Sequence, residues 1–159
     1  MATNDKYDRQ IRIWGADGQR RLNSSTVLCL GISAAGTETL KNLALPGIGY
    51  LRIVSDAKVE ERDFHRNFFL DPDSLGKNIA EEILTNLLEM NPDVKGDFRA
   101  KSVSAYIQED LDELCKASLI IVDCLSFVSL DLEVQILTSR PLAWRSTKFA
   151  RSKISLWSC

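Results

Sequence analysis

The residues from Gly31 to Gly36 have the types and the spacing to bind a nucleotide. The letters GISAAG follow a short apolar run and precede an amphipathic stretch, as in the phosphate-binding turn of dinucleotide-binding proteins. That turn needs the pattern G-x-G-x-x-G, because the middle glycine lets the backbone approach the pyrophosphate. Here Ser33 takes the middle position and Ala34 follows it. The turn therefore keeps its outer glycines and lacks the inner ones.

A P-loop is excluded at the same place. In a P-loop the second glycine is followed by Lys and Ser or Thr, and the lysine offsets the charge of the β- and γ-phosphates. In this chain Gly36 is followed by Thr37 and Glu38, and a carboxylate there would repel a bound phosphate. Two interpretations stay open: a turn that only packs helix on strand, and a weakened nucleotide site. We favour the first, since a match without the full glycine set is weak.

The elements around this turn alternate between strand and helix. Apolar or β-prone runs predict strands at residues 26–30, 50–54, 98–103 and 119–124. Helical periodicity predicts helices at residues 8–22, 35–45, 77–90, 109–115 and 128–137. Gly15 and Gly18 weaken the middle of the first helix. This alternation predicts an α/β fold with a doubly wound, mostly parallel, Rossmann-like sheet.

The bulk composition is that of one ordinary soluble domain. The chain has 159 residues, of which 45% are hydrophobic and 26% charged, and its formal net charge is −2. This balance does not favour a nucleic-acid partner. No stretch approaches the roughly 18 apolar residues of a membrane span, so no membrane partner is expected. The opening letters MATNDKYDRQ lack the apolar core of a signal peptide, and we expect the cytosol or the nucleus.

Metal chemistry is not indicated. The four cysteines lie at positions 29, 115, 124 and 159 without CxxC spacing, and His65 is the only histidine. A zinc site needs closely spaced cysteine and histidine ligands. Cys29 and Cys124 lie in apolar runs, so we expect them to be buried structural thiols.

Five strings of the sequence, taken in order, resemble one family. They are KYDRQIRIWG (6–15), ETLKNLALPGIG (38–49), RNFFL (66–70), LGKNIAE (75–81) and LEMNPDVKG (88–96). Together they resemble the adenylation domain of activating enzymes for ubiquitin-like modifiers, which has a ThiF/MoeB-like fold. Within that family they are most similar to the regulatory subunits of the heterodimeric enzymes of neddylation, with the regulatory subunit of the sumoylation enzyme as the alternative. The resemblance covers residues 6–142, which we interpret as a pseudo-adenylation domain.

The resemblance implies a pseudo-symmetric heterodimer in which only the catalytic subunit binds ATP and magnesium. Active relatives carry a G-x-G-G-x-G turn and, after the second strand, two aspartates in an I-D-x-D pattern for ribose and magnesium. Here Ser33 and Ala34 replace the inner glycines, Ser55 and Ala57 stand at the aspartate positions, and Asp56 is out of step by one residue. The resemblance therefore implies that this chain binds no cofactor, has no activity alone, and is a subunit of a ligase-type enzyme that activates the modifier.

Arg9 is the residue that the resemblance places in the chemistry. In this family the arginine of the Y-x-R-Q motif reaches into the ATP site of the partner subunit. There its planar cation would offset charge while the modifier's carboxylate attacks the α-phosphate. The residues alone leave the alternative that Arg9 forms a surface ion pair with Asp8 or Asp17. The neighbouring residues expected at the dimer interface are Tyr7, Gln10 and Trp14, with a core position as the alternative for the tryptophan.

Arg66 and Lys77 match basic positions of active relatives, and those relatives carry an aspartate near the position of Asp123. Arg66 and Lys77 could contact phosphates, and Asp123 ends the last predicted strand, where open α/β sheets place ligands. Because the glycine turn is degenerate, we interpret all three as vestigial or structural.

Two enzymatic alternatives are disfavoured by the same residues. An independent adenylating homodimer is disfavoured by Ser33 in the glycine turn and by Ser55 and Ala57 at the aspartate positions. A nicotinamide- or adenosyl-binding Rossmann enzyme is allowed by the fold alone. It would need an acidic ribose ligand at the end of the second strand, where Ser55 stands.

The tail from 143 to 159 differs from the rest of the chain. Its letters AWRSTKFARSKISLWSC are basic and rich in serine, and they show no sustained period. We predict a divergent basic extension outside the sheet. Regulatory subunits of this family are longer, so we expect a domain that is incomplete at its C-terminus. A splice form, a frameshift or a gene-model error would explain this tail, and a truncated form without activity stays an open alternative.

Overall fold

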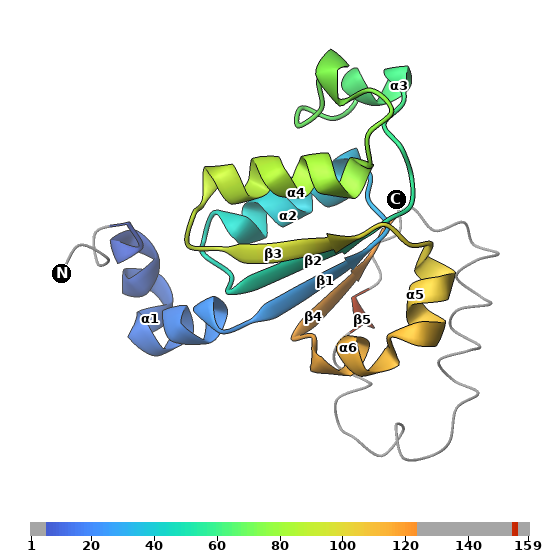
Figure 1. Cartoon of the computed structure of the whole chain (residues 1–159). Coiled ribbons are helices and arrows are strands. Elements are labelled where there is room, and N and C mark those ends of the chain that lie inside the picture. The colour runs from blue at the N-terminus through green and yellow to red at the C-terminus, as the bar shows by residue number, and fades with distance from the viewer. Residues whose placement is uncertain (1–5, 124–153, 156–159) are drawn as a thin grey trace.

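The computed structural model describes residues 6–123 and 154–155 (Figure 1). The predicted helix at 128–137 and most of the tail at 143–159 lie outside the described residues.

Parallel strands form one sheet in the order β3-β2-β1-β4-β5. The strands are β1 (Thr26–Leu30), β2 (Tyr50–Val54), β3 (Lys95–Arg99), β4 (Leu119–Val122) and β5 (Ile154–Ser155). β1 lies at the centre, with Val27 in register with Leu51 of β2 and Leu119 of β4. The strand order reverses between β1 and β4, and open α/β sheets bind ligands outside the carboxyl ends of strands at such a point.

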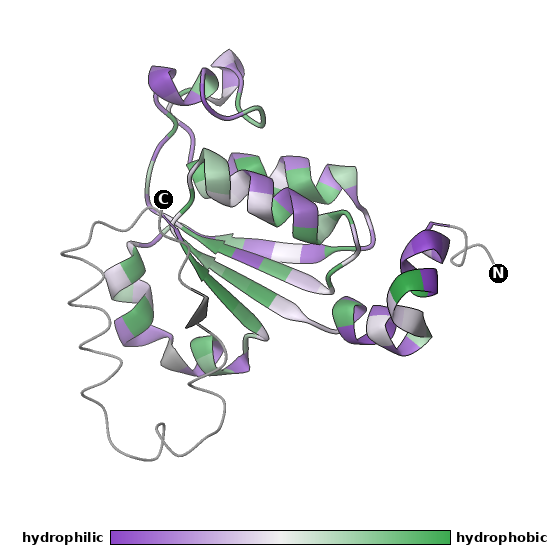
Figure 2. Ribbon diagram, turned by 180° about the vertical axis from the view of Figure 1, so that it is seen from behind, coloured by the Kyte–Doolittle hydropathy of each residue, from purple (hydrophilic) through white to green (hydrophobic). Residues whose placement is uncertain are grey.

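Helices cover both faces of this sheet, as Figures 1 and 2 show. The helices α2 (Ala34–Ala44) and α4 (Ile79–Met90) pack on one face, and α5 (Val103–Glu109) and α6 (Leu111–Lys116) pack on the other. β1 is apolar from Val27 to Leu30 because both of its faces are buried. Its residues Val27 and Cys29 face the first layer, and Leu28 and Leu30 face the second. The predicted α/β, doubly wound, parallel fold is confirmed.

The N-terminal helix α1 (Asp8–Asn23) lies at the end of the sheet where the strands begin (Figure 1). Gly15 has φ +76° and interrupts its helical geometry, which divides α1 into two segments. The predicted weakness in the middle of this helix is confirmed at that residue.

Two sequence predictions need correction. β3 ends at Arg99 and not at 103, because the Ser102 side chain accepts a hydrogen bond from the Ala105 amide and starts α5. The tail does not lie wholly outside the sheet, since Ile154 and Ser155 pair with β4. Without them, the backbone groups on that side of β4 would face outward as an unpaired edge.

The connection from β2 to α4 contains two short helical turns, α3 (Glu61–Phe64) and η1 (Pro72–Ser74). The helices of the described residues are all too short or too polar to cross a bilayer.

Packing of α2 on the sheet can be tested with two leucines. Leu40 is fully buried, whereas Leu45, at the end of the same helix, is 44% exposed. We expect Leu40→Ala to lower the free energy of unfolding by about 2–5 kcal/mol, because it leaves a cavity in the core. The control Leu45→Ala should change it by no more than about 0.5 kcal/mol. Urea denaturation measures both, and equal losses would contradict this packing.

Candidate functional site

The turn between β1 and α2 begins the candidate site. Gly31 follows β1 with φ +79°, and α2 begins three residues later at Ala34. Ser33 is the N-cap of α2, and its Oγ accepts a hydrogen bond from the Gly36 amide at 3.2 Å. Ser33, which replaces the middle glycine, therefore caps the N-terminus of α2 with its own side chain.

Asp123, at the end of the neighbouring strand β4, is hydrogen-bonded to the same turn. It directly follows β4, and its amide donates a hydrogen bond to the Leu30 carbonyl of β1 at 2.8 Å. Its Oδ2 accepts from the Ser33 amide at 2.6 Å, and its Oδ1 accepts from Ser33 Oγ at 3.0 Å. We call these two bonds the Ser33–Asp123 clasp. The carboxylate lies at the positive end of α2, the place where a Rossmann fold binds phosphate.

Gly36 makes room for this carboxylate. A Cβ at position 36 would lie 1.9 Å from Asp123 Oδ2, far inside a van der Waals contact. The last glycine of the degenerate turn is therefore needed for the clasp, whatever its relation to a nucleotide.

The end of β2 contributes no carboxylate to the site. Ser55 is buried, and its Oγ accepts a hydrogen bond from the Ala57 amide at 3.2 Å. Its carbonyl accepts from Asn78 Nδ2 at 2.9 Å, and Asn78 caps α4. Asp56, the nearest acid, is exposed. The hydrogen bonds of Ser55 and Asn78 connect the loop after β2 to α4. These two side chains do not fit the ribose and magnesium of a bound nucleotide. Within residues 6–123, no group of three or more His, Cys, Asp or Glu side chains could hold a metal ion.

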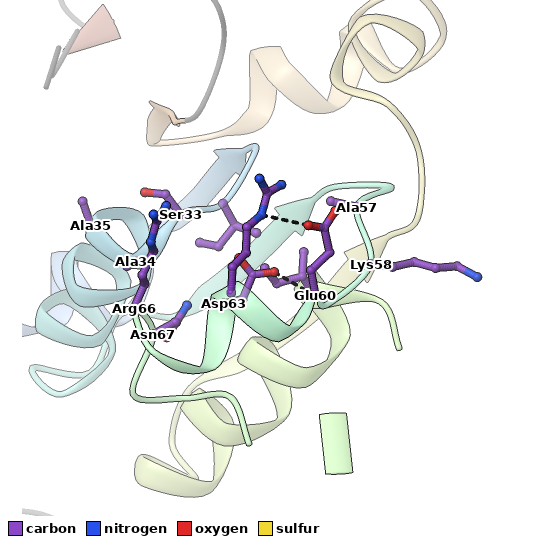
Figure 3. Close-up of a pocket in the computed structure, with 12 residues that line it drawn as sticks. Ser33, Ala34, Ala35, Ala57, Lys58, Glu60, Asp63, Arg66 and Asn67 are labelled. Atoms are coloured by element: carbon purple, nitrogen blue, oxygen red, sulfur yellow. Dashed lines mark hydrogen bonds and ion pairs between the residues drawn. The ribbon is translucent and has the colours of Figure 1, made fainter. Parts of the chain in front are cut away.

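A cavity of about 580 Å³ lies between the β1–α2 turn and the connection from β2 to α4 (Figure 3). Arg66 lines it, whereas Lys77 points to another partner and pairs with Glu82 at 3.2 Å. The structure thus brings only one of the two predicted basic residues to the cavity. A second lining arginine, Arg62, is paired with Glu60 at 2.8 Å.

Asn67 is a site residue that the sequence analysis missed. It is buried, and its Nδ2 donates to Thr37 Oγ1 at 2.9 Å. Thr37 Oγ1 in turn donates to the Ser33 carbonyl at 2.8 Å, so the connection is tied to the first turn of α2. The string RNFFL contains Asn67, but its partner lies 30 residues away, so no local pattern could have paired them.

Arg9 lies in the first turn of α1, and no residue of α1 lines the cavity. That helix lies at the end of the sheet where the strands begin (Figure 1), whereas the cavity lies beside the turn that follows β1. The Arg9 side chain is exposed, and no other described residue forms a hydrogen bond or ion pair with it. Both acids considered as its partners are engaged otherwise: Asp8 pairs with Arg12 at 2.7 Å, and Asp17 pairs with Arg20. The Arg9 guanidinium is therefore exposed to solvent.

The three residues expected at a dimer interface lie in different environments. Tyr7 is 7% exposed and so lies inside this chain. Trp14 is 42% exposed and donates its indole N–H to Gln19 Oε1 at 3.0 Å. Gln10 has a buried Oε1 that accepts no hydrogen bond from the described residues. Their interface role stays a prediction.

The clasp predicts non-additive effects on stability. Asp123→Ala should cost about 1–3 kcal/mol, because the partly buried Ser33 donors lose their acceptor. Gly36→Ala should cost a similar amount through the clash of its Cβ with the carboxylate. The double variant should cost less than the sum by about 0.5–3 kcal/mol, since the clash is absent without Asp123.

Urea denaturation of the four proteins measures this coupling. The exposed Asp56→Ala serves as the control, with an expected change within about 0.5 kcal/mol. Strictly additive costs would mean that the Asp123 carboxylate does not occupy the space beside Gly36.

Comparisons with known proteins identify relatives among subunits of activating enzymes. The NEDD8-activating enzyme E1 regulatory subunit of Xenopus laevis is 44% identical over 116 residues, which are 73% of this chain and 22% of that protein. The SUMO-activating enzyme subunit 1B-1 of Arabidopsis thaliana is 39% identical over 113 residues, which are 66% of this chain and 35% of that protein. The chain spans about a fifth of the length of the neddylation relatives that it matches.

Solved structures share the fold. The crystal structure of E. coli MccB with ATP aligns with a TM-score of 0.70 at 24% identity, covering 84% of this chain and 41% of that chain. Residues 7–141 match the sequence model of the ThiF family. With the parallel sheet, the strand order and the degenerate turn described above, this match shows that the chain belongs to the ThiF family.

Proposed function

We propose that this chain is a non-catalytic regulatory subunit of a NEDD8-activating enzyme. It binds a catalytic subunit, which holds ATP and magnesium, and it supports adenylation of the ubiquitin-like modifier. The relatives named as NEDD8-activating E1 regulatory subunits support this assignment. The observation that carries it is a contrast within one chain: Asp123 occupies the start of α2, whereas Arg9 is exposed and has no partner among the described residues.

The negative charge of Asp123 explains why the turn between β1 and α2 disfavours a nucleotide. A phosphate at the start of α2 would lie close to the Asp123 carboxylate. Two unit charges of like sign 4 Å apart repel by about 4 kcal/mol at an effective dielectric constant of 20. The Ser33 amide, which would bind a phosphate oxygen, already donates to that carboxylate. A bound nucleotide would have to break the clasp, and the chain would gain no magnesium ligand from Ser55 or Ala57 in return.

Arg9 supplies what the partner's site needs. A guanidinium is planar, permanently charged and suited to phosphate oxygens. Supplied in trans, it stabilises the charge that develops at the α-phosphate as the modifier's carboxylate attacks. In other phosphoryl-transfer systems such an arginine accelerates the reaction on the order of 10³–10⁵-fold.

A second candidate is the same role in a SUMO-activating enzyme. The relative from Arabidopsis thaliana supports it, because its 39% identity approaches that of the neddylation relatives. A third candidate is a form that binds the catalytic subunit without supporting activity, which the short length relative to those proteins makes worth testing.

Reconstitution tests the proposed function. Co-expression with the catalytic subunit of a NEDD8-activating enzyme should give a one-to-one complex that forms an ATP-dependent NEDD8 thioester. Arg9→Ala should leave the complex intact and slow adenylation on the order of 10³-fold. The matched control Arg12→Ala, on the same exposed surface of α1, should change the rate less than about twofold, since its partner Asp8 belongs to the same chain.

Other outcomes separate the candidates. Thioester formation with SUMO and its catalytic subunit, but not with NEDD8, would select the sumoylation role. A stable complex without thioester would select binding without activity. ATP–pyrophosphate exchange by this chain alone would contradict its non-catalytic assignment.

A further inference from the structure

Three of the recognised sequence strings meet around the side chain of Tyr7. Tyr7 belongs to KYDRQIRIWG, Gly47 to ETLKNLALPGIG, and Asn91 and Asp93 to LEMNPDVKG. Tyr7 lies 84 and 86 residues from the last two in the chain, yet it is hydrogen-bonded to both. We call Lys6, Gly47, Asn91 and Asp93 the Tyr7 socket.

The Tyr7 hydroxyl is held from two sides. It donates to Asp93 Oδ2 at 2.9 Å and accepts from Asn91 Nδ2 at 3.1 Å. Asn91 is 1% exposed, and its Nδ2 also donates to the Ala44 carbonyl at 2.7 Å. The socket therefore connects the first residues of the chain to the end of α2 and to the end of α4.

Gly47 leaves the space that the phenol ring fills. It has φ +88°, which side chains rarely adopt, and a Cβ there would lie 2.6 Å from the Tyr7 hydroxyl oxygen. Conformation and space both require glycine at this position.

The charges of the socket are stable. Lys6 Nζ lies 2.9 Å from Asp93 Oδ2 and 2.5 Å from Asn91 Oδ1. The hydrogen bonds from Lys6 and then from Tyr7 hold the pKa of Asp93 below its usual value, and the bond to Asp93 raises the pKa of Lys6. Both groups therefore stay charged over the whole neutral range in which enzymes are assayed.

The Tyr7 socket lies directly before the first turn of α1. The Tyr7 carbonyl accepts a hydrogen bond from the Ile11 amide at 2.9 Å and so closes the first turn, which contains Arg9. Gly15 interrupts α1 between this turn and β1. The part of α1 that joins β1 therefore does not fix the orientation of the first turn. The hydroxyl bonds of Tyr7 provide a direct attachment to the body of the domain on the other side of that break.

We propose that the Tyr7 socket positions Arg9 for its action on the partner's phosphates. This inference rests on the proposed function, and it makes Tyr7 a positioning residue within its own chain. Placement matters because a displacement of about 1 Å at a reacting group can cost on the order of 100-fold in rate.

Tyr7→Phe in the complex with the catalytic subunit tests the inference. The variant keeps the ring and removes both hydroxyl bonds. We expect the kcat of adenylation to fall by about 10- to 100-fold, with the KM for ATP changed less than about twofold and the complex intact. The matched control is Tyr106→Phe, which removes another buried hydroxyl, bonded to Glu113 at 2.8 Å on the other face of the sheet. It should leave kcat unchanged, although it also removes a buried bond.

A double-variant cycle distinguishes positioning from general destabilisation. In the Arg9→Ala background, Tyr7→Phe should have no further effect on kcat, because the residue that it positions is gone. An equal fall in both backgrounds, or no fall in the presence of Arg9, would overturn the inference while leaving the proposed function in place. If Arg9→Ala alone leaves the rate unchanged, the role of Arg9 fails first and the positioning inference fails with it.

Discussion

The two hydrogen bonds from Ser33 to the Asp123 carboxylate are the contact on which the character of this domain depends. They join the carboxyl ends of β1 and β4, which are neighbours in the sheet although Ser33 and Asp123 lie 90 residues apart in the chain. They place a negative charge at the start of α2, where the helix dipole and the free amides favour an anion. In a nucleotide-binding relative of this fold type that anion is a phosphate. Here the chain provides it itself, and Gly36 gives it room.

The clasp and the Tyr7 socket lie at opposite ends of the sheet, the clasp after β1 and β4 and the socket before β2 and β3. The clasp satisfies the Ser33 amide beside the carboxyl end of β1, and the socket holds Tyr7, just before the first turn of α1, at the end where the strands begin. In the proposed account, the first contact removes this chain's own reaction and the second prepares Arg9 for the reaction of its partner. Both contacts depend on the spacing and direction of the parallel strands.

Much of the fold could be predicted from the sequence, and the failures have physical causes. β1 and β2 were predicted at their observed residues, because strands buried on both faces are mostly apolar: β1 is apolar apart from Thr26, and β2 apart from Arg52. β3 was misplaced because its residues are polar: Asp97 forms two bonds with Arg52 of β2, at 2.5 and 2.8 Å, and hydropathy does not register such a pair. The loss of the inner glycines was visible in the sequence. That Asp123 fills the space beside Ser33, and that Tyr7 lies inside the chain, depends on contacts between distant segments that no local pattern encodes.

The central claim is that the chain's own carboxylate takes the place of a nucleotide phosphate. Titration of the isolated chain with MgATP tests it most directly, with the backbone amide signals of Ser33 and Gly36 followed by NMR. No saturable shift of either signal is expected up to millimolar nucleotide, since the Ser33 amide already donates to Asp123 and the Gly36 amide already donates to Ser33 Oγ. Saturable shifts of these two signals would show that a phosphate displaces Asp123, and would contradict the account.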